Sequence, residues 1–170
     1  MYNVFSRKTS LRRINSKKNI FFTFFPRIFY LNMEIVDGKI FSNGWTPYRD
    51  GDKMTYADRN GVIMDRLFDW CGYFNDGMAS VGLDGKSSFI DQDGNLIGDG
   101  TLWFKHTYPF SNGLGGVCND DEKWTYIDKN GHMPINQWFD HIDRFMPNGK
   151  ADVCLDGEWF KIDKNGNRKK

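Results

Sequence analysis

The chain has 170 residues and a formal net charge of +1, from 23 basic and 22 acidic side chains. Seven of the basic residues and none of the acidic ones lie in residues 1–33, so residues 34–170 are net acidic. A globally basic nucleic-acid-binding body is therefore excluded for the main part of the chain. With 39% hydrophobic and 16% aromatic residues, the chain is too apolar to be wholly disordered. No stretch approaches the roughly 18 apolar residues of a transmembrane helix.

Residues 1–33 differ from the rest in being basic, free of acid and rich in Phe. Their apolar stretch, residues 20–25, ends at Pro26-Arg27 and is shorter than the hydrophobic region of a secretory signal. We expect a basic, poorly ordered segment. Three alternatives stay open: a tail translated from Met1, a biological start at Met33, or a weak targeting sequence. If translated, this segment is the part expected to contact nucleic acid or an anionic membrane.

A three-part pattern recurs four times in residues 34–170. The first part is a Phe followed closely by Asn or Asp and Gly: Phe41–Gly44, Phe74–Gly77, Phe110–Gly113 and Phe145–Gly149. The second part is an Asp pair or Asp-Gly: Asp50-Gly51, Asp84-Gly85, Asp120-Asp121 and Asp156-Gly157. The third part ends in Asp-x-Asn-Gly or Asp-x-Asp-Gly: Tyr56–Gly61, Phe89–Gly94, Tyr126–Gly131 and Lys161–Gly166. The glycines of the first part are 33, 36 and 36 residues apart, which divides the chain at about 40–73, 74–109, 110–144 and 145–170.

Each repeat is predicted to be a small antiparallel meander. A first strand such as 77–83 runs into Asp-Gly, which favours a tight hairpin because both residues tolerate a positive φ. A second strand such as 123–128 then meets the Asp-x-Asn-Gly turn, and a third apolar stretch follows, as at 133–135 or 62–64. The last repeat is expected to lack this third strand. A meander of this size cannot bury its face alone, so the sequence predicts an all-β fold of tandem β-meander repeats stacked as a short solenoid-like array.

The repeat resembles the bacterial WG repeat family, also called KWG repeats. The most similar copy is Phe110–Gly131, and the resemblance covers about residues 40–166. The Trp-Gly pair that names the family is replaced by Met54-Thr55, Ser87-Ser88, Trp124-Thr125 and Trp159-Phe160. The segment Lys123–Met133 is also similar, more weakly, to the aromatic repeats of choline-binding and glucan-binding proteins, which have a shorter period. The WG resemblance implies a β-rich module that binds or scaffolds, without a family-wide enzyme activity or cofactor.

No catalytic, cofactor or metal site is predicted from the residue types. The Asp-rich turns lack the closing Glu of an EF-hand calcium loop and are interpreted as structural turns. The histidines, His106, His132 and His141, show no metal-binding spacing. The three cysteines form no CxxC pair, and Cys118 and Cys154 are separated by one repeat period, so whether they pair stays open.

The aromatic residues give the best indication of function. Those on the second strands, among them Trp124 and Trp159, are expected to pack between repeats. The candidates for an exposed binding surface are the aromatic residues in or near the loops: Trp45, Trp70, Trp103, Tyr108 and Trp138. The prediction is a non-catalytic module that binds or scaffolds a protein, and the alternative is carbohydrate or cell-wall binding through exposed tryptophans. A cytoplasmic location is slightly favoured over the cell surface or secretion.

Overall fold

The computed structural model describes residues 11–13, 33–36 and 39–169. The prediction of a poorly ordered segment at residues 1–33 falls almost entirely outside these residues. Within them the chain forms β-strands, turns and one short 3-10 helix, with no α-helix. The all-β prediction is confirmed. The described residues also include no helix of the length and apolarity needed to cross a membrane.

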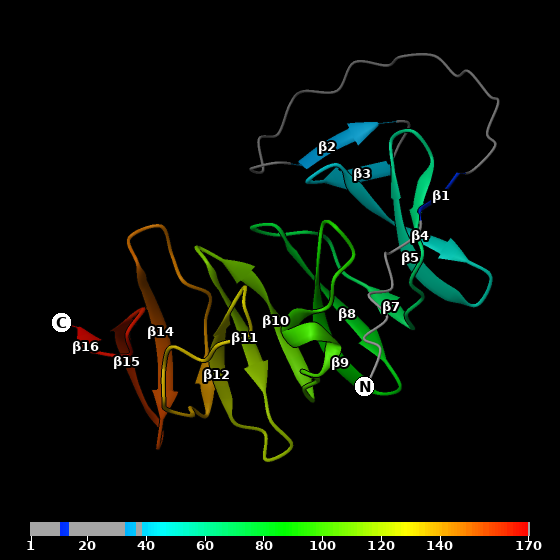
Figure 1. The fold of residues 1–170 in the computed structure, drawn as a ribbon. Helices are drawn as coiled ribbons and strands as arrows, with labels where there is room; N and C mark the ends of the chain where they lie inside the picture. Colours follow the sequence, from blue (N-terminus) through cyan, green and yellow to red (C-terminus); the bar gives the residue numbers. More distant parts are fainter. Residues whose placement is uncertain (1–10, 14–32, 37–38, 170) are drawn as a thin grey trace, which may run out of the picture.

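The strands form four antiparallel sheets that follow one another in sequence order (Figure 1). The first sheet, in the order β1-β6-β5-β4-β3-β2, contains β1 (Leu11–Arg13), β2 (Met33–Val36), β3 (Lys39–Ser42), β4 (Trp45–Asp50), β5 (Lys53–Asp58) and β6 (Val62–Met64). The second sheet contains β7 (Trp70–Cys71), β8 (Met78–Leu83) and β9 (Lys86–Asp91). The third sheet, after the 3-10 helix η1 (Ile97–Gly100), contains β10 (His106–Ser111), β11 (Leu114–Cys118) and β12 (Trp124–Asp128). The fourth sheet contains β13 (His141–Ile142), β14 (Lys150–Leu155), β15 (Glu158–Asp163) and β16 (Arg168–Lys169).

The segments that link successive sheets form hydrogen bonds with both of them. In the first link the backbone of Phe68 exchanges two 2.8 Å hydrogen bonds with Met54 of the first sheet. The next residue, Asp69, donates its N–H to the carbonyl of Gly82 in the second sheet, at 2.7 Å. Equivalent pairs of contacts are made through Phe104-Lys105 and Phe139-Asp140. Each link therefore fixes the position of one sheet relative to the next.

Two kinds of tight turn set the register of the strands. Asp84-Gly85 in the second sheet and Asp156-Gly157 in the fourth both have positive φ at both residues, as the predicted hairpins require. In the Asp-x-Asn-Gly turn of the third repeat, Oδ1 of Asp128 accepts the N–H groups of Asn130 and His132, each at 2.9 Å. Asp58, Asp91 and Asp163 make the same two hydrogen bonds in their own repeats. The recurring Asp is therefore a turn-forming residue.

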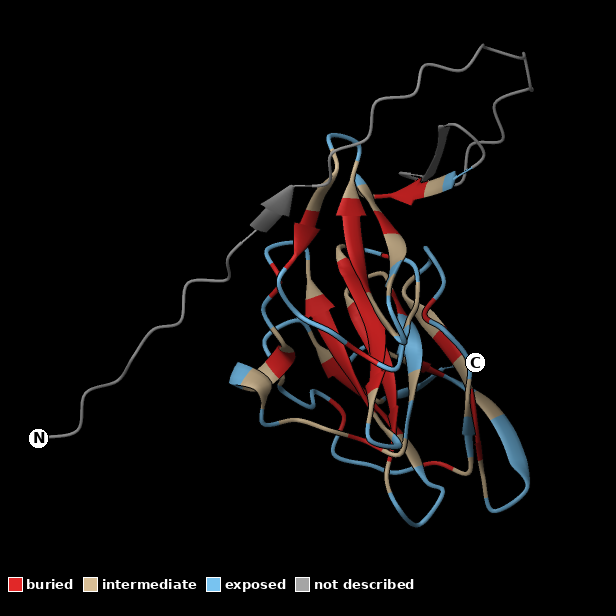
Figure 2. Cartoon of the chain, turned by 90° about the vertical axis from the view of Figure 1, so that its right-hand side faces the viewer, coloured by how far each residue is buried: buried red, intermediate tan, exposed pale blue. Residues whose placement is uncertain are grey.

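Aromatic side chains connect each sheet to the next. The aromatic residue on the second strand of a meander contacts the Phe that opens the following repeat, and the ring centroids are 4.7 to 4.8 Å apart: Tyr56 with Phe74, Phe89 with Phe110, and Tyr126 with Phe145. All six rings are buried. The buried strands occupy the middle of the molecule and the exposed turns lie at its ends (Figure 2). Stacking of the repeats, as expected from the size of one meander, is the source of the hydrophobic core.

The third strand agrees with the prediction in the first repeat, where residues 62–64 form β6, and differs from it in the third and last repeats. The third repeat has no strand at 133–135, where Pro134 cannot donate a backbone hydrogen bond. The last repeat, expected to lack a third strand, has β16, whose Arg168 and Lys169 pair with Ile162 and Lys161 of β15. The polar sequence of β16 gave no hydrophobic signal from which a strand could be predicted.

Candidate binding surface

Three sheets present aromatic or imidazole rings at equivalent positions, two residues after Phe68, Phe104 and Phe139. Together with the second-strand tryptophans of the third and fourth sheets, these rings form what we call the aromatic row; it consists of Trp70, His106, Trp124, His141 and Trp159. In the third sheet His106 lies opposite Cys118 of β11, which in turn lies opposite Trp124 of β12. The fourth sheet repeats this register with His141, Cys154 and Trp159. The row is therefore set by strand pairing.

The rings of the row stack across the strand that separates them. The rings of His141 and Trp159 have centroids 6.1 Å apart and planes 6° from parallel. His106 and Trp124 form the equivalent pair, with 6.4 Å between centroids and 20° between planes. Trp159 is 58% exposed and both histidines are exposed, whereas Cys118 and Cys154 beneath the stacks are buried. The outer surface of each stack is accessible to a ligand.

In the second sheet the row continues with Trp70, which is 44% exposed. Its indole covers Gly82 on the neighbouring strand, and a Cβ atom at Gly82 would overlap with the indole ring. Gly82 occupies the place of Cys118 and Cys154, and Ser87 occupies the place of the second-strand tryptophans. The second sheet thus holds one large ring where the next two hold a stacked pair.

The structure divides the five candidate residues into two groups. Trp70, Tyr108 and Trp138 are exposed, and of these only Trp70 belongs to the aromatic row. Trp45 and Trp103 instead pack against the hydrophobic cluster between the first and second sheets. Trp103 is held further by its indole N–H, which donates to the carbonyl of Gly100 at 3.1 Å.

Sequence reasoning missed the other four members of the row. Trp124 and Trp159 were expected between repeats, and the structure shows Trp124 half-buried and Trp159 exposed. His106 and His141 were not recognised as equivalents of Trp70. The signal that finds them is their common position two residues after the linking Phe.

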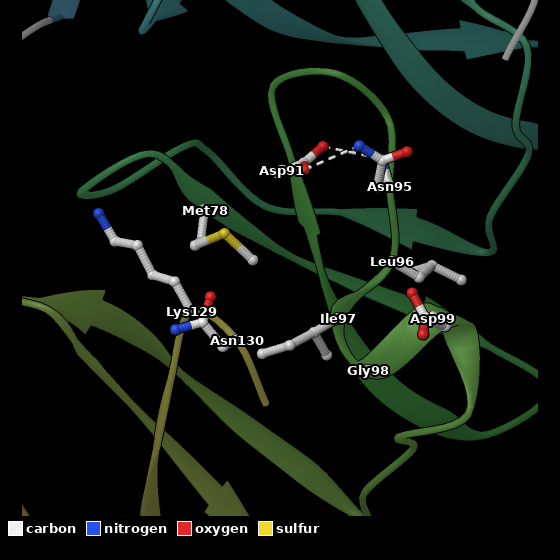
Figure 3. Close-up of a pocket in the computed structure, with 9 residues that line it drawn as sticks. All are labelled: Met78, Asp91, Asn95, Leu96, Ile97, Gly98, Asp99, Lys129 and Asn130. Carbon is white, nitrogen blue, oxygen red and sulfur yellow. Dashed lines mark hydrogen bonds between the residues drawn. The ribbon is translucent and has the colours of Figure 1, made fainter. Parts of the chain in front are cut away.

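A polar cavity of about 260 Å³ lies where η1 approaches the turn after β12 (Figure 3). Its lining includes Met78, Asp91, Asn95, Leu96, Ile97, Gly98, Asp99, Lys129 and Asn130. Asp91 is engaged by the N–H groups of its own turn and by the Asn95 side chain, and Lys129 is paired with Asp76 at 3.1 Å. The cavity arises because the second repeat has a longer connection than the others between its Asp-x-x-Gly turn and the next linking Phe.

The ionisable groups near the row are occupied by structural contacts. The pKa of Asp140 is held below its usual value first by the ammonium of Lys123, and the backbone N–H of Asp156 adds to this effect.

Burial raises the pKa of the Cys71 thiol to about 12 and also raises that of Cys118. All three cysteines are free. Among the residues that the structure describes, no group of three or more His, Cys, Asp or Glu side chains is arranged to hold a metal ion.

Comparison with known proteins gives a family and a distant structural similarity. The model of a family described as "WG containing repeat" matches residues 55–86 and 124–159. No curated protein matches the chain. A crystal structure of Hsv2 from Kluyvelomyces marxianus is 14% identical with a TM-score of 0.45, over 71% of this chain and 46% of that one. The WD40 β-propeller domain of Doa1 is 13% identical with a TM-score of 0.39, over 81% and 51%. The chain thus spans about half the length of the solved structures that it matches.

Proposed function

Because the chain is a WG repeat protein, we propose that it is a non-catalytic module that binds a protein partner through the aromatic row. The observation that carries the proposal is the recurrence of exposed rings at one repeat position in three successive sheets. Tryptophan contributes more than most residues to binding energy at protein interfaces, because its large surface is buried at a small cost in entropy. A row of rings on rigid strands suits an extended partner.

The surroundings of the row support binding rather than catalysis. The recurring carboxylates accept backbone N–H groups or pair with lysines, and the row histidines contact indole rings. A histidine that acts as a general base needs a group that orients it and a nucleophile within hydrogen-bond reach. The imidazoles of His106 and His141 instead lie against the indoles of Trp124 and Trp159. The row therefore supplies contact area rather than reactive groups.

The proposal is tested by capture on the immobilised chain, followed by a binding measurement with one identified protein. The double variant Trp70→Ala/Trp159→Ala should weaken that binding by about tenfold or more, since interface tryptophans commonly contribute at least 1.4 kcal/mol. Met146→Ala is the matched control, because Met146 is 47% exposed and lies outside the row. Equal binding by both variants would refute the role of the row.

Carbohydrate binding is the second candidate, and the Trp159 and His141 pair favours it. An exposed flat indole supported by a parallel imidazole provides a surface on which the apolar face of a sugar ring can stack. The test is a panel of soluble glycans and peptidoglycan fragments. Binding that is lost in Trp159→Ala and kept in Met146→Ala would support this candidate, and absence of binding across the panel would remove it.

A further inference from the structure

Each inner sheet packs one face against the sheet that follows it, and the third sheet shows the residues that this requires. We call this side the outgoing face. On it lie Leu114 and Gly116 of β11 and Tyr126 of β12, with Gly116 directly opposite Tyr126. Leu114 and Tyr126 belong to the hydrophobic cluster shared with Phe145 of the fourth repeat.

Gly116 is required at its position by the close approach of the fourth sheet. A Cβ atom there would lie 2.6 Å from Cδ1 of Ile142, which belongs to the fourth sheet, and 2.8 Å from Cβ of Tyr108. Real Cβ atoms essentially never come this close to other heavy atoms. In the three sheets that receive a neighbour, this position carries an uncharged residue, Pro47, Ser80 or Gly116. The residue opposite it is in each case a ring that contacts the incoming Phe.

The fourth sheet has a different set of residues on the same face. In register, Lys150 stands in the place of Leu114, Asp152 in that of Gly116 and Lys161 in that of Tyr126. Lys161 is exposed, and its Nζ lies 2.7 Å from both carboxylate oxygens of Asp152. An incoming repeat would meet the charged Asp152 side chain where the other three sheets carry Pro, Ser or Gly, and would bury an ion pair.

The residues of the aromatic row are kept in the fourth sheet, although the packing residues of its outgoing face are replaced. His141, Cys154 and Trp159 on the fourth sheet are equivalent to His106, Cys118 and Trp124 on the third, with the same cross-strand stacking. The substitutions are confined to the positions that make contact between sheets. The loss of packing residues is therefore selective, and it does not reflect a general divergence of the last repeat.

We infer that the outgoing face of the fourth sheet is an end cap. It prevents a further WG repeat, from this chain or from a second copy, from packing against this sheet. Repeat proteins need a polar outer face on their terminal repeats, because an uncovered packing face is an adhesive apolar surface. Here the cap consists of Lys150, Asp152 and Lys161. These residues lie on the same face of the fourth sheet as Trp159, and the inference does not depend on which partner binds the aromatic row.

The experiment asks whether a further repeat docks on this face. A copy of residues 132–170 is joined directly after Gly166, in the way that Gly131 leads into the fourth repeat. Two extended chains are compared: one keeps the cap, and the other carries Lys150→Leu, Asp152→Gly and Lys161→Tyr. Hydrogen exchange is measured for the backbone amides of the added copy.

In the chain that keeps the cap, the added copy should exchange at the rate of an unfolded segment. In the triple variant, exchange of its strand amides should slow by roughly tenfold or more, because packing restores the Tyr and Phe contact. Protection of the copy on the unaltered face would overturn the inference, and so would an unprotected copy in the triple variant. If the triple variant loses protection in its own fourth sheet, the double variant Asp152→Gly/Lys161→Tyr replaces it. Lys164→Tyr, in an exposed turn, controls for the added aromatic residue.

Discussion

Gly82 determines where the Trp70 ring lies. We expect Gly82→Ala to push the indole off β8, because the new methyl group would occupy the space of the ring. Trp70 is exposed and can turn into solvent, so the free energy of unfolding should fall by less than about 1 kcal/mol. The chemical shift of the Trp70 indole N–H should change clearly, and partner binding should fall as in a variant that lacks the ring. An unchanged indole resonance would contradict this placement.

Tyr126 has a second structural role besides ring packing. Its hydroxyl group donates a 2.6 Å hydrogen bond to the carbonyl of Asp143 in the next link, and burial raises its pKa. We expect Tyr126→Phe to lower the free energy of unfolding by about 1 kcal/mol, since the ring contact stays and the hydrogen bond is lost. Urea denaturation measures the change. Tyr56→Phe should behave alike, because Tyr56 donates to the carbonyl of Gly72 at 2.8 Å.

At the scale of single residues, the role of a side chain can be predicted from the sequence when its partners are near in the chain. The turn role of Asp128 follows from the residues immediately after it. The exposure of Trp159 could not be read in this way, because it lies on the same strand face as Lys161 and only the presence or absence of a further sheet decides whether that face is covered. Trp45 and Trp103 are the converse case, because their burial depends on a cluster assembled from two repeats.

Two linking segments connect neighbouring sheets through one carboxylate. Asp69 pairs with Lys53 of the sheet before it and accepts the backbone N–H of Asp84 in the hairpin after it. Asp140 does the same with Lys123 and Asp156. In the second link this position is Lys105, which pairs with Glu122, and Lys86 pairs directly with Asp120. The same junction is thus stabilised in two chemically different ways.

These carboxylates make stability depend on pH. The pKa of Asp69 and that of Asp140 are lowered in the folded state, chiefly by their lysine partners. A lowered folded-state pKa means that the stabilisation is complete above the unfolded value of about 4 and is lost as pH falls toward the folded value. Asp140→Asn should therefore flatten the fall in melting temperature below about pH 4. Asp121→Asn, at an exposed turn, is the control and should leave the slope unchanged.

The elements themselves were largely predictable, because their turn chemistry is local. Asp84-Gly85 and Asp156-Gly157 were recognised as hairpins from residue type alone, and the structure has the expected positive φ angles. The pairing of each link with two sheets was not predictable. Phe68 and its equivalents form backbone bridges to a strand that comes before them in the sequence. The spacing of these Phe residues does not indicate which strand they pair with.

At the scale of the whole molecule, the junction between the second and third sheets differs from the other two. Its second-strand aromatic is Phe89, which has no hydroxyl group, and its link carries Lys105 in place of the bridging Asp. It therefore lacks two hydrogen bonds to backbone groups that the other junctions have. Near Lys105 it is held by ion pairs at exposed positions, which salt screens, and at the other end of β10 by the Gly113 N–H, which donates to Asp76.

This junction should open before the others. The amide of Lys105, which donates to Cys118 at 3.0 Å, should exchange with deuterium faster than the equivalent amides of Asp69 and Asp140. Added salt should accelerate Lys105 more than the other two, because its link has ion pairs alone, and the carboxylate to N–H bond of this junction, from Gly113 to Asp76, lies at the other end of β10. Equal rates at all three amides would show that the junctions open together.

The linking segments have a consequence for self-association. A strand with unpaired N–H and C=O groups at the side of a sheet can recruit a strand from another molecule. Along β9 the chain itself takes these places: Phe104 pairs with Ser87 at one end and Leu96 bridges to Ile90 at the other. Phe139 does the same for Trp124 of β12, and the carbonyl of His132 accepts the N–H of Asp128. The path of the chain between repeats therefore protects the inner sheets against aggregation by strand addition.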